Sequence, residues 1–327
     1  MSEVTRSRIE QFRGIMPSYL RDRIATMRRY WNLYWIVVRD QVEFLGFTTP
    51  LLRTAVWLFS LLPALPIAWR LLKFDRLIYE RGLVEAADWL LNRYYRGYST
   101  SAISAADLVL PSNYRGELLY ANHVGLADVL ALLSWWNRSD AYIITKERAL
   151  IRALPALSEH VISIGNGPAE RRQMLQRLVQ RLAEGARVVL FPAGRIENDP
   201  WFLSAGEPAI LEWSGLIGYL LGYGRKQGFR FTLQPVLTGN VYAPVSRSFY
   251  SVLVPKRRSL RNDRNKYLAF FTFIFRLGRY QPLRLIPDRV LTFEDIPAEH
   301  QGKKAITEFF RNRLIMLAGT VTRYSGE

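Results

Sequence analysis

The chain has 327 residues, enough for one large domain with an accessory element and an ample core. It contains no cysteine, which excludes disulfides, thiol nucleophiles and thiolate zinc sites, and its three widely separated histidines argue against a histidine metal site. Lys and Arg number 45 against 28 Asp and Glu, and the resulting net charge of +17 favours an anionic partner: a membrane surface, a nucleic acid, or an acidic substrate or carrier. Nine tryptophans, within an aromatic content of 13%, favour a lipid interface.

Residues 1–43 are polar and basic and lack the apolar region of a signal peptide. Within them, residues 18–40 have a helical pattern, with aromatic and apolar side chains tending to one side and arginines elsewhere. Two interpretations fit this pattern. One is a helix on a membrane surface, and the other is an ordinary amphipathic helix docked on the domain.

Residues 44–72 are the most apolar part of the chain, but their uninterrupted core, 54–69, is shorter than the roughly 20 residues of a spanning helix. Pro63 and Pro66 lie near its centre and are expected to break or kink a helix. Basic residues flank the segment on both sides, so the charge asymmetry of a single span is missing. These features favour a helical hairpin that enters one leaflet, with a single span and a buried soluble helix as alternatives.

Residues 73–98 are predicted to form a further helix. From residue 102 onward, short apolar runs alternate with helical patterns, which is typical of an α/β sandwich with a mostly parallel central sheet. The predicted strands cover 117–121, 141–145, 161–164, 187–191, 229–237 and 251–254. The predicted helices cover 126–136, 168–184, 208–227 and 303–317. We therefore expect a helical membrane-association segment, residues 1–97, followed by an α/β domain, residues 98–327.

Residues 118–136 carry the most informative pattern, a short apolar strand that turns into an apolar helix. His123 lies in the turn, and Asp128 lies in the first turn of the helix, where a carboxylate also suits the helix dipole. A carboxylate at this place can hold the imidazole in one tautomer and leave its other nitrogen outward as a general base. Because a His-x4-Asp spacing also arises by chance, the pair needs support from the rest of the chain.

Three later stretches add candidates. Residues 187–195 read RVVLFPAGR, a strand ending in a Pro-Ala-Gly turn whose glycine permits close approach of a ligand. In residues 161–172, a strand and a turn lead into a helix that begins at Pro168 and carries Glu170, Arg171 and Arg172 near its start. Helix amides with guanidinium groups make a phosphate site, although solvent-facing helix charges explain these arginines equally well.

The N-H-x4-D pattern, with Asn122 before His123, resembles the first motif of the glycerolipid (PlsC-like, lysophospholipid) acyltransferase family. FPAGR resembles the FPEGTR motif of that family, and the Gln-Pro-Val stretch around Pro235 resembles its fourth motif. Ala193 stands where the family has Glu, and Arg195 stands where it has Thr. Residues 162–165 align with the second motif, with Gly165 in the place of its arginine. These matches follow the family's order over about residues 102–239.

The resemblance implies a PlsC-like acyltransferase αβ sandwich preceded by a membrane-associated helical segment. It implies an O-acyltransferase that moves a fatty acyl chain from acyl-CoA or acylated carrier protein to a hydroxyl of a lysophospholipid-like or other anionic lipid. His123 would be the general base and Asp128 its partner. The hydroxyl would attack directly, because the chain has neither a cysteine nor a G-x-S-x-G serine. The substrate-binding positions that it implies are Asn122, Lys146, Arg171, Arg172, Pro192, Gly194, Arg195 and Pro235.

The missing carboxylate at Ala193 puts the usual acceptor in question, and Arg195 or Glu197 would replace it in part. We expect no cofactor besides the acyl donor, no metal and no nucleic acid. The expected location is the cytoplasmic face of the inner membrane, bound to anionic lipids. A basic cluster in residues 256–266, before an aromatic stretch that ends at residue 277, indicates either a second membrane contact or a basic loop before a core helix.

Two other functions remain open. A catalytically degenerate lipid- or acyl-binding protein of the same fold would explain Ala193. A nucleic-acid-binding protein would explain the net charge of +17, although no recognised nucleic-acid motif accompanies the basic residues.

Overall fold

The computed structural model describes residues 18–100, 114–165, 167–203, 207–242, 264–300 and 302–324. The chain divides into two compact units. The first consists of residues 1–73 together with 149–154, and the second consists of residues 74–148 and 155–327. The predicted strand at 251–254 and the basic residues 256–263 lie outside the described residues.

The first unit is a hairpin of two helices, α2 (Ser18–Leu45) and the first part of α3 (Pro50–Arg81), with the short α6 (Ala149–Arg152) against α2. The Tyr30 hydroxyl of α2 donates a hydrogen bond to the Leu65 carbonyl of α3 at 3.2 Å. Farther along, the rings of Trp35 and Trp57 stack with their centroids 6.2 Å apart. The chain reverses at residues 46–49, where Gly46 has a φ of 68°.

The expected helix break at Pro63 and Pro66 is wrong. Helix α3 runs through both prolines for 32 residues, so the turn of the hairpin, at residues 46–49, precedes the uninterrupted apolar core 54–69 and does not lie within it. Each proline removes one backbone hydrogen bond, and the many others of a long cooperative helix outweigh that loss. Among the described residues, α3 is the one helix long and apolar enough to cross a membrane, and 22% of its most apolar window is buried.

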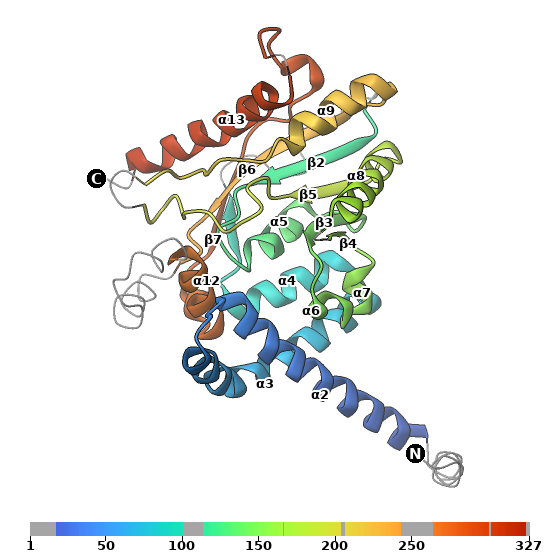
Figure 1. Ribbon diagram of the computed structural model, residues 1–327, viewed down its shortest axis with the longest axis vertical. Coiled ribbons are helices and arrows are strands. Elements are labelled where there is room, and N and C mark those ends of the chain that lie inside the picture. Colours follow the sequence, from blue (N-terminus) through green and yellow to red (C-terminus); the bar gives the residue numbers. More distant parts are fainter. Residues whose placement is uncertain are drawn as a thin grey trace. The chain divides into compact units, whose positions relative to one another are not determined.

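The strands described in the second unit form one seven-stranded sheet in the order β1-β7-β6-β2-β5-β3-β4 (Figure 1). All neighbouring strands are parallel except β6 and β7, which are antiparallel, so the predicted mostly parallel α/β sheet is confirmed. The strands are β1 (Tyr98–Thr100), β2 (Gly116–Ala121), β3 (Ala141–Lys146), β4 (Val161–Ile164), β5 (Arg187–Leu190), β6 (Phe231–Gly239) and β7 (Leu283–Pro287).

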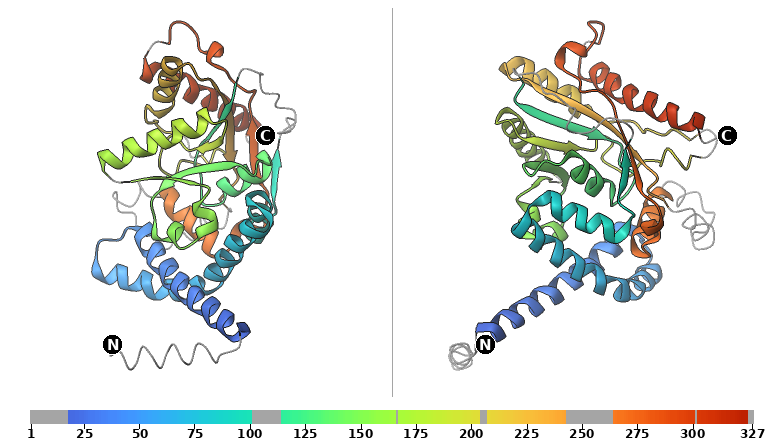
Figure 2. Two further views of the ribbon diagram at one scale, coloured as in Figure 1. Left: turned by 90° about the vertical axis from the view of Figure 1, so that its right-hand side faces the viewer. Right: turned by 180° about the vertical axis from the view of Figure 1, so that it is seen from behind.

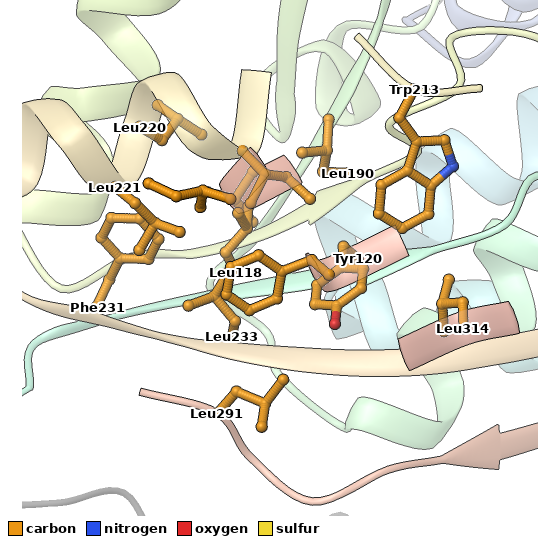
Figure 3. Close-up of a cluster of buried hydrophobic side chains, with 14 of the residues drawn as sticks. Leu118, Tyr120, Leu190, Trp213, Leu220, Leu221, Phe231, Leu233, Leu291 and Leu314 are labelled. Atoms are coloured by element: carbon orange, nitrogen blue, oxygen red, sulfur yellow. The ribbon is translucent and has the colours of Figure 1, made fainter. Parts of the chain in front are cut away.

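Helices cover both faces of this sheet. The helices α9 (Leu216–Gln227) and α13 (Lys303–Tyr324) lie side by side, as Figures 1 and 2 show, and share a buried cluster with α8 (Pro168–Ala183). In this cluster, Leu118 and Tyr120 of β2 meet Leu314 of α13 and other apolar side chains (Figure 3). Leu119 lies between them in β2, so its side chain points to the opposite face of the sheet. It is also fully buried, because helices cover that face as well. On that side lie α4 (Leu83–Tyr94) and α5 (Asp128–Trp136).

Several predicted elements differ from the structure. The helix predicted at 73–98 is two helices, because the chain bends at Gly82, where φ is +89°. The helix predicted at 208–227 begins only at Leu216, and residues 207–215 are irregular. The short strands β1 and β7 were not predicted. Strand β4 has its predicted bounds, and β2, β3, β5 and β6 differ from theirs by one or two residues.

The predicted aromatic stretch before residue 277 largely forms α12 (Arg264–Ile274). Residues 267–270 are buried in the second unit, and the ring of Phe273 stacks on that of Tyr94 with 4.1 Å between centroids. For the described part of the stretch, this burial favours the core-helix interpretation over a second membrane contact. The remaining short elements are the helix α7 (Pro155–Ser158) and, after α12, two 3-10 turns, η2 (Leu277–Tyr280) and η3 (Phe293–Asp295).

Candidate active site

The site lies at the corner where β2 passes into α5 (Figure 1). Strand β2 ends at Ala121, residues 122–127 turn the chain, and α5 begins at Asp128. Because β2, β5, β3 and β4 are parallel neighbours, the loops that follow them all leave the same edge of the sheet. Ligands of open α/β sheets bind at this carboxyl edge.

His123 and Asp128 form a hydrogen-bonded pair. Nδ1 of His123 lies 2.9 Å from Oδ2 of Asp128, whose side chain is fully buried. The same oxygen accepts the backbone amides of Val124 at 2.7 Å and Gly125 at 3.1 Å, and Oδ1 accepts the amide of Val129 at 2.7 Å. An oxygen that accepts two amides favours Nδ1–H as the third donor. The other nitrogen, Nε2, then carries the lone pair, and the imidazole is 26% exposed.

Opposing effects act on the pKa of His123. Burial alone would lower it, but the charge of Asp128 and its hydrogen bond raise it, and the charge of Glu197 raises it further. Arg148 has a smaller, lowering effect. The net result is a pKa above the ordinary value of 6.5. The imidazole is therefore a stronger base than a free one, and a larger share of it is protonated at neutral pH.

Asn122, in the turn after β2, and Pro235, in β6, are both buried. The Asn122 side chain donates to the Thr238 carbonyl at 2.9 Å and accepts the Thr238 amide at 2.7 Å. The Thr238 hydroxyl donates back to the Asn122 carbonyl at 2.8 Å. Pro235 pairs in register with Tyr120. The contacts of Asn122 fasten the catalytic turn to the neighbouring strand β6.

The loop after β5 reaches the imidazole. The ring of Phe191 lies against His123, with 4.5 Å between ring centroids. The next residues turn, with the amide of Gly194 donating to the Phe191 carbonyl at 3.0 Å, and the φ of +64° at Gly194 explains the glycine. Pro192 is buried, whereas Gly194 and Arg195 are exposed. Among the described residues, nothing forms a hydrogen bond or ion pair with the Arg195 guanidinium.

Glu197 belongs to the same loop and is fully buried. Its Oε2 accepts the backbone amide of His123 at 3.0 Å, and its Oε1 accepts the amide of Leu211 at 2.8 Å. The Glu197 amide donates in turn to the His123 carbonyl at 2.5 Å. Burial raises the pKa of Glu197 to about 7, against the lowering effect of the two amides. The sequence indicated Glu197 only as a partial substitute for the motif carboxylate.

The remaining predicted cations line the same edge farther from the base. Lys146 is exposed at the end of β3, and Arg171 and Arg172 are exposed on the first turns of α8, which follows the outer strand β4. Arg148, two residues past Lys146, is the cation whose charge reaches His123. Sequence reasoning missed it, because the basic position after this strand was matched to Lys146. Within the described ranges, no group of three or more metal-ligating side chains occurs.

Comparisons with known proteins add little to this geometry. No protein-family model matches the sequence, and no curated protein matches it. The solved structure of the 1-acyl-sn-glycerophosphate (LPA) acyltransferase PlsC from Thermotoga maritima is similar with a TM-score of 0.39 and 13% sequence identity. The match covers 90% of this chain and 97% of that one. Likeness at this level carries no functional weight, so the chemistry rests on the His123–Asp128 pair and its surroundings.

Proposed function

We propose that this protein is a membrane-associated acyltransferase that moves a fatty acyl group from a thioester to a hydroxyl of an anionic lipid. The observation that carries the proposal is the His123–Asp128 pair at the carboxyl edge of a parallel sheet. A buried carboxylate fixed by three backbone amides leaves Nε2 as a base that can face a substrate. The family resemblance of the motifs around both His123 and Phe191 supports the same activity.

In the proposed reaction, Nε2 of His123 takes the proton of the acceptor hydroxyl as its oxygen attacks the thioester carbonyl. Asp128 balances the charge of the imidazolium that forms. The tetrahedral intermediate then expels the thiolate, which takes the proton from His123, so an ester and a free thiol result. Base catalysis contributes roughly 10²–10⁴ in rate, and positioning of the two substrates adds to it. The chain has no cysteine to form an acyl-enzyme.

The charges along the edge support an anionic acceptor. The FPAGR turn carries the exposed cation Arg195 and, at Ala193, lacks a carboxylate that would repel a phosphate. The exposed Lys146, Arg171 and Arg172 extend the cationic edge toward β4. A donor that carries phosphate, as acyl-CoA and an acylated carrier protein both do, suits this more distant part.

The exposed side chains of the helical hairpin support membrane binding at an anionic bilayer. Four tryptophans of α2 and α3 are exposed: Trp31, Trp35, Trp57 and Trp69. Tryptophan is enriched at membrane interfaces, and exposed arginines such as Arg28 and Arg53 would meet anionic head groups. We place this contact on the cytoplasmic face of the inner membrane.

The test is an assay of purified protein with lysolipids that differ only in the presence of a phosphate, using acyl-CoA and acylated carrier protein in turn. Wild type should acylate the phosphorylated lysolipid. His123→Ala should lose at least a factor of about 100, because no base remains. His300→Ala, which alters a histidine elsewhere in the fold, is the control and should keep full turnover. Equal turnover in the His123→Ala protein would refute the mechanism.

The absence of the carboxylate at position 193 also fits a protein that binds acyl lipids without turning them over. The same assay separates the two functions. Saturable binding of lysolipid by wild type, with no acyl transfer from either donor, would favour the binding protein.

A further inference from the structure

The buried carboxyl of Glu197 faces the backbone of the catalytic turn. It holds the amide of His123 at 3.0 Å, while its own backbone amide holds the His123 carbonyl. Both polar groups of the His123 peptide backbone are therefore bound by one residue. Ala193, where the family motif has its carboxylate, lies four positions earlier in the same loop.

We propose that Glu197 is a positioning residue for acyl transfer, which fixes the backbone of His123 and adds a negative charge beside its imidazole. The inference rests on the proposed function of His123 as the base.

The far side of the carboxyl is fixed as well. Oε1 of Glu197 accepts the amide of Leu211, whose carbonyl accepts Nε of Arg311 at 2.7 Å. Arg311 also donates to the Ile210 carbonyl at 3.1 Å, and it belongs to α13. A continuous set of hydrogen bonds thus runs from a long helix through residues 210–211 and Glu197 to His123. Both oxygens of the Glu197 carboxyl are thus held by backbone amides.

A buried carboxylate two residues away provides a comparison. Asp199 accepts the amides of Trp201, Asn240, Val241 and Tyr242, and it forms no hydrogen bond with His123. It braces the same loop against the end of β6. The charged groups that act on His123 are Asp128, Glu197 and Arg148, and the groups that face the Glu197 carboxyl are His123 and the indole of Trp213. Asp199 therefore serves as a matched control for burial and loop bracing without a hydrogen bond to His123.

The experiment is an NMR titration of the imidazole rings in full-length protein labelled at histidine. The chain has three histidines, so His160 and His300 report on the fold in the same spectra. Removing the charge in Glu197→Gln should make His123 titrate at a lower pH and leave His160 and His300 unchanged. In kinetics, kcat should fall about 10- to 100-fold because the base is misplaced, with both KM values unchanged.

Two further variants separate positioning from simple bracing. Asp199→Asn should lower thermal stability and leave the titration of His123 unchanged. Glu197→Asp keeps the charge but is one methylene too short to hold both amides, so His123 should titrate near its wild-type pH while kcat falls. This variant also serves if Glu197→Gln does not fold.

Unchanged titration of His123 in folded Glu197→Gln, or an unchanged kcat, would overturn the inference. The NMR measurement needs no turnover, so it stands apart from the proposed function. If wild type transfers no acyl group but the titration moves as expected, the proposed function fails and the coupling of Glu197 to His123 holds.

Discussion

As the proposed base, His123 has to lose its proton before it can accept one from a hydroxyl, so the effect of its neighbours on its pKa can be measured in a pH–rate profile. Because Asp128 and Glu197 raise its pKa above 6.5, the acid limb of kcat/KM should be centred above pH 6.5. Asp128→Asn removes the main raising effect. Its acid limb should move to lower pH, while its maximal rate drops by roughly 10²–10⁴ as the tautomer is no longer fixed. A pH–rate profile of both proteins measures this, and an acid limb that stays in place would contradict it.

Arg195 allows a separate test at the acceptor. A charge-assisted hydrogen bond is worth about 1.5–3 kcal/mol, so Arg195→Ala should lower kcat/KM for a phosphorylated acceptor by about 10- to 100-fold. The donor KM should hardly change, because the loss is local to the acceptor. Lys226→Ala removes an exposed cation from α9 and is the control. Unchanged acceptor kinetics in Arg195→Ala would show that the acceptor anion is bound elsewhere.

The titration of Glu197 also predicts how stability depends on pH. Its pKa is 4.5 when unfolded and about 7 when folded, so between these values the native state holds a proton that the unfolded state has lost. Stability from this group therefore falls as pH rises from 4.5 to 7, by about 3 kcal/mol in all. Urea unfolding at pH 5 and pH 8 should show a smaller difference for Glu197→Gln than for wild type. An equal difference in both proteins would contradict the raised pKa.

At the scale of elements, the sequence predicts most of the parallel strands, because buried strands appear in it as short apolar runs between turns. Residues 161–164 show this most simply, since the predicted and observed bounds agree. Strand β1 was missed because its three residues, Tyr98–Thr100, are too few and too polar to stand out. The same method failed at residues 208–215, where an apolar pattern indicated a helix. There, the Leu211 amide donates to Glu197 and the Leu211 carbonyl accepts a hydrogen bond from Arg311, and these contacts hold the chain in an irregular path that local sequence does not encode.

The candidate site likewise has one part that the sequence predicts and another that it does not. The pairing of His123 with Asp128 follows from a five-residue spacing across one strand-to-helix corner, so sequence alone sufficed to expect it. The place of Glu197 depends on how the loop after β5 folds against that corner, 74 positions away along the chain. The effect of Arg148 depends likewise on the loop after β3. Contacts between loops of different strands are set by the sheet order, which no local pattern contains.

At the scale of the whole molecule, the exposed tryptophans of α2 and α3 lead to a prediction about binding to vesicles. Replacing Trp31 and Trp69 with Ser should weaken binding to vesicles that contain anionic lipid, because both rings are exposed and would lie at the interface. The control is Tyr280→Ser, because Tyr280 is an exposed aromatic residue of the second unit. Trp136 is unsuitable as a control because it is buried. Cosedimentation measures the effect. Binding that survives in the double variant would exclude the hairpin as the main membrane contact.

The first unit takes its last piece, residues 149–154, from far along the sequence. During synthesis, α2 and the first part of α3 leave the ribosome long before α6, which later packs against α2. The nascent hairpin is therefore incomplete for the time needed to make about 75 further residues. Throughout that interval, the part of α2 that α6 later contacts is uncovered. Folding of the first unit is therefore completed only after residues 149–154 have been made.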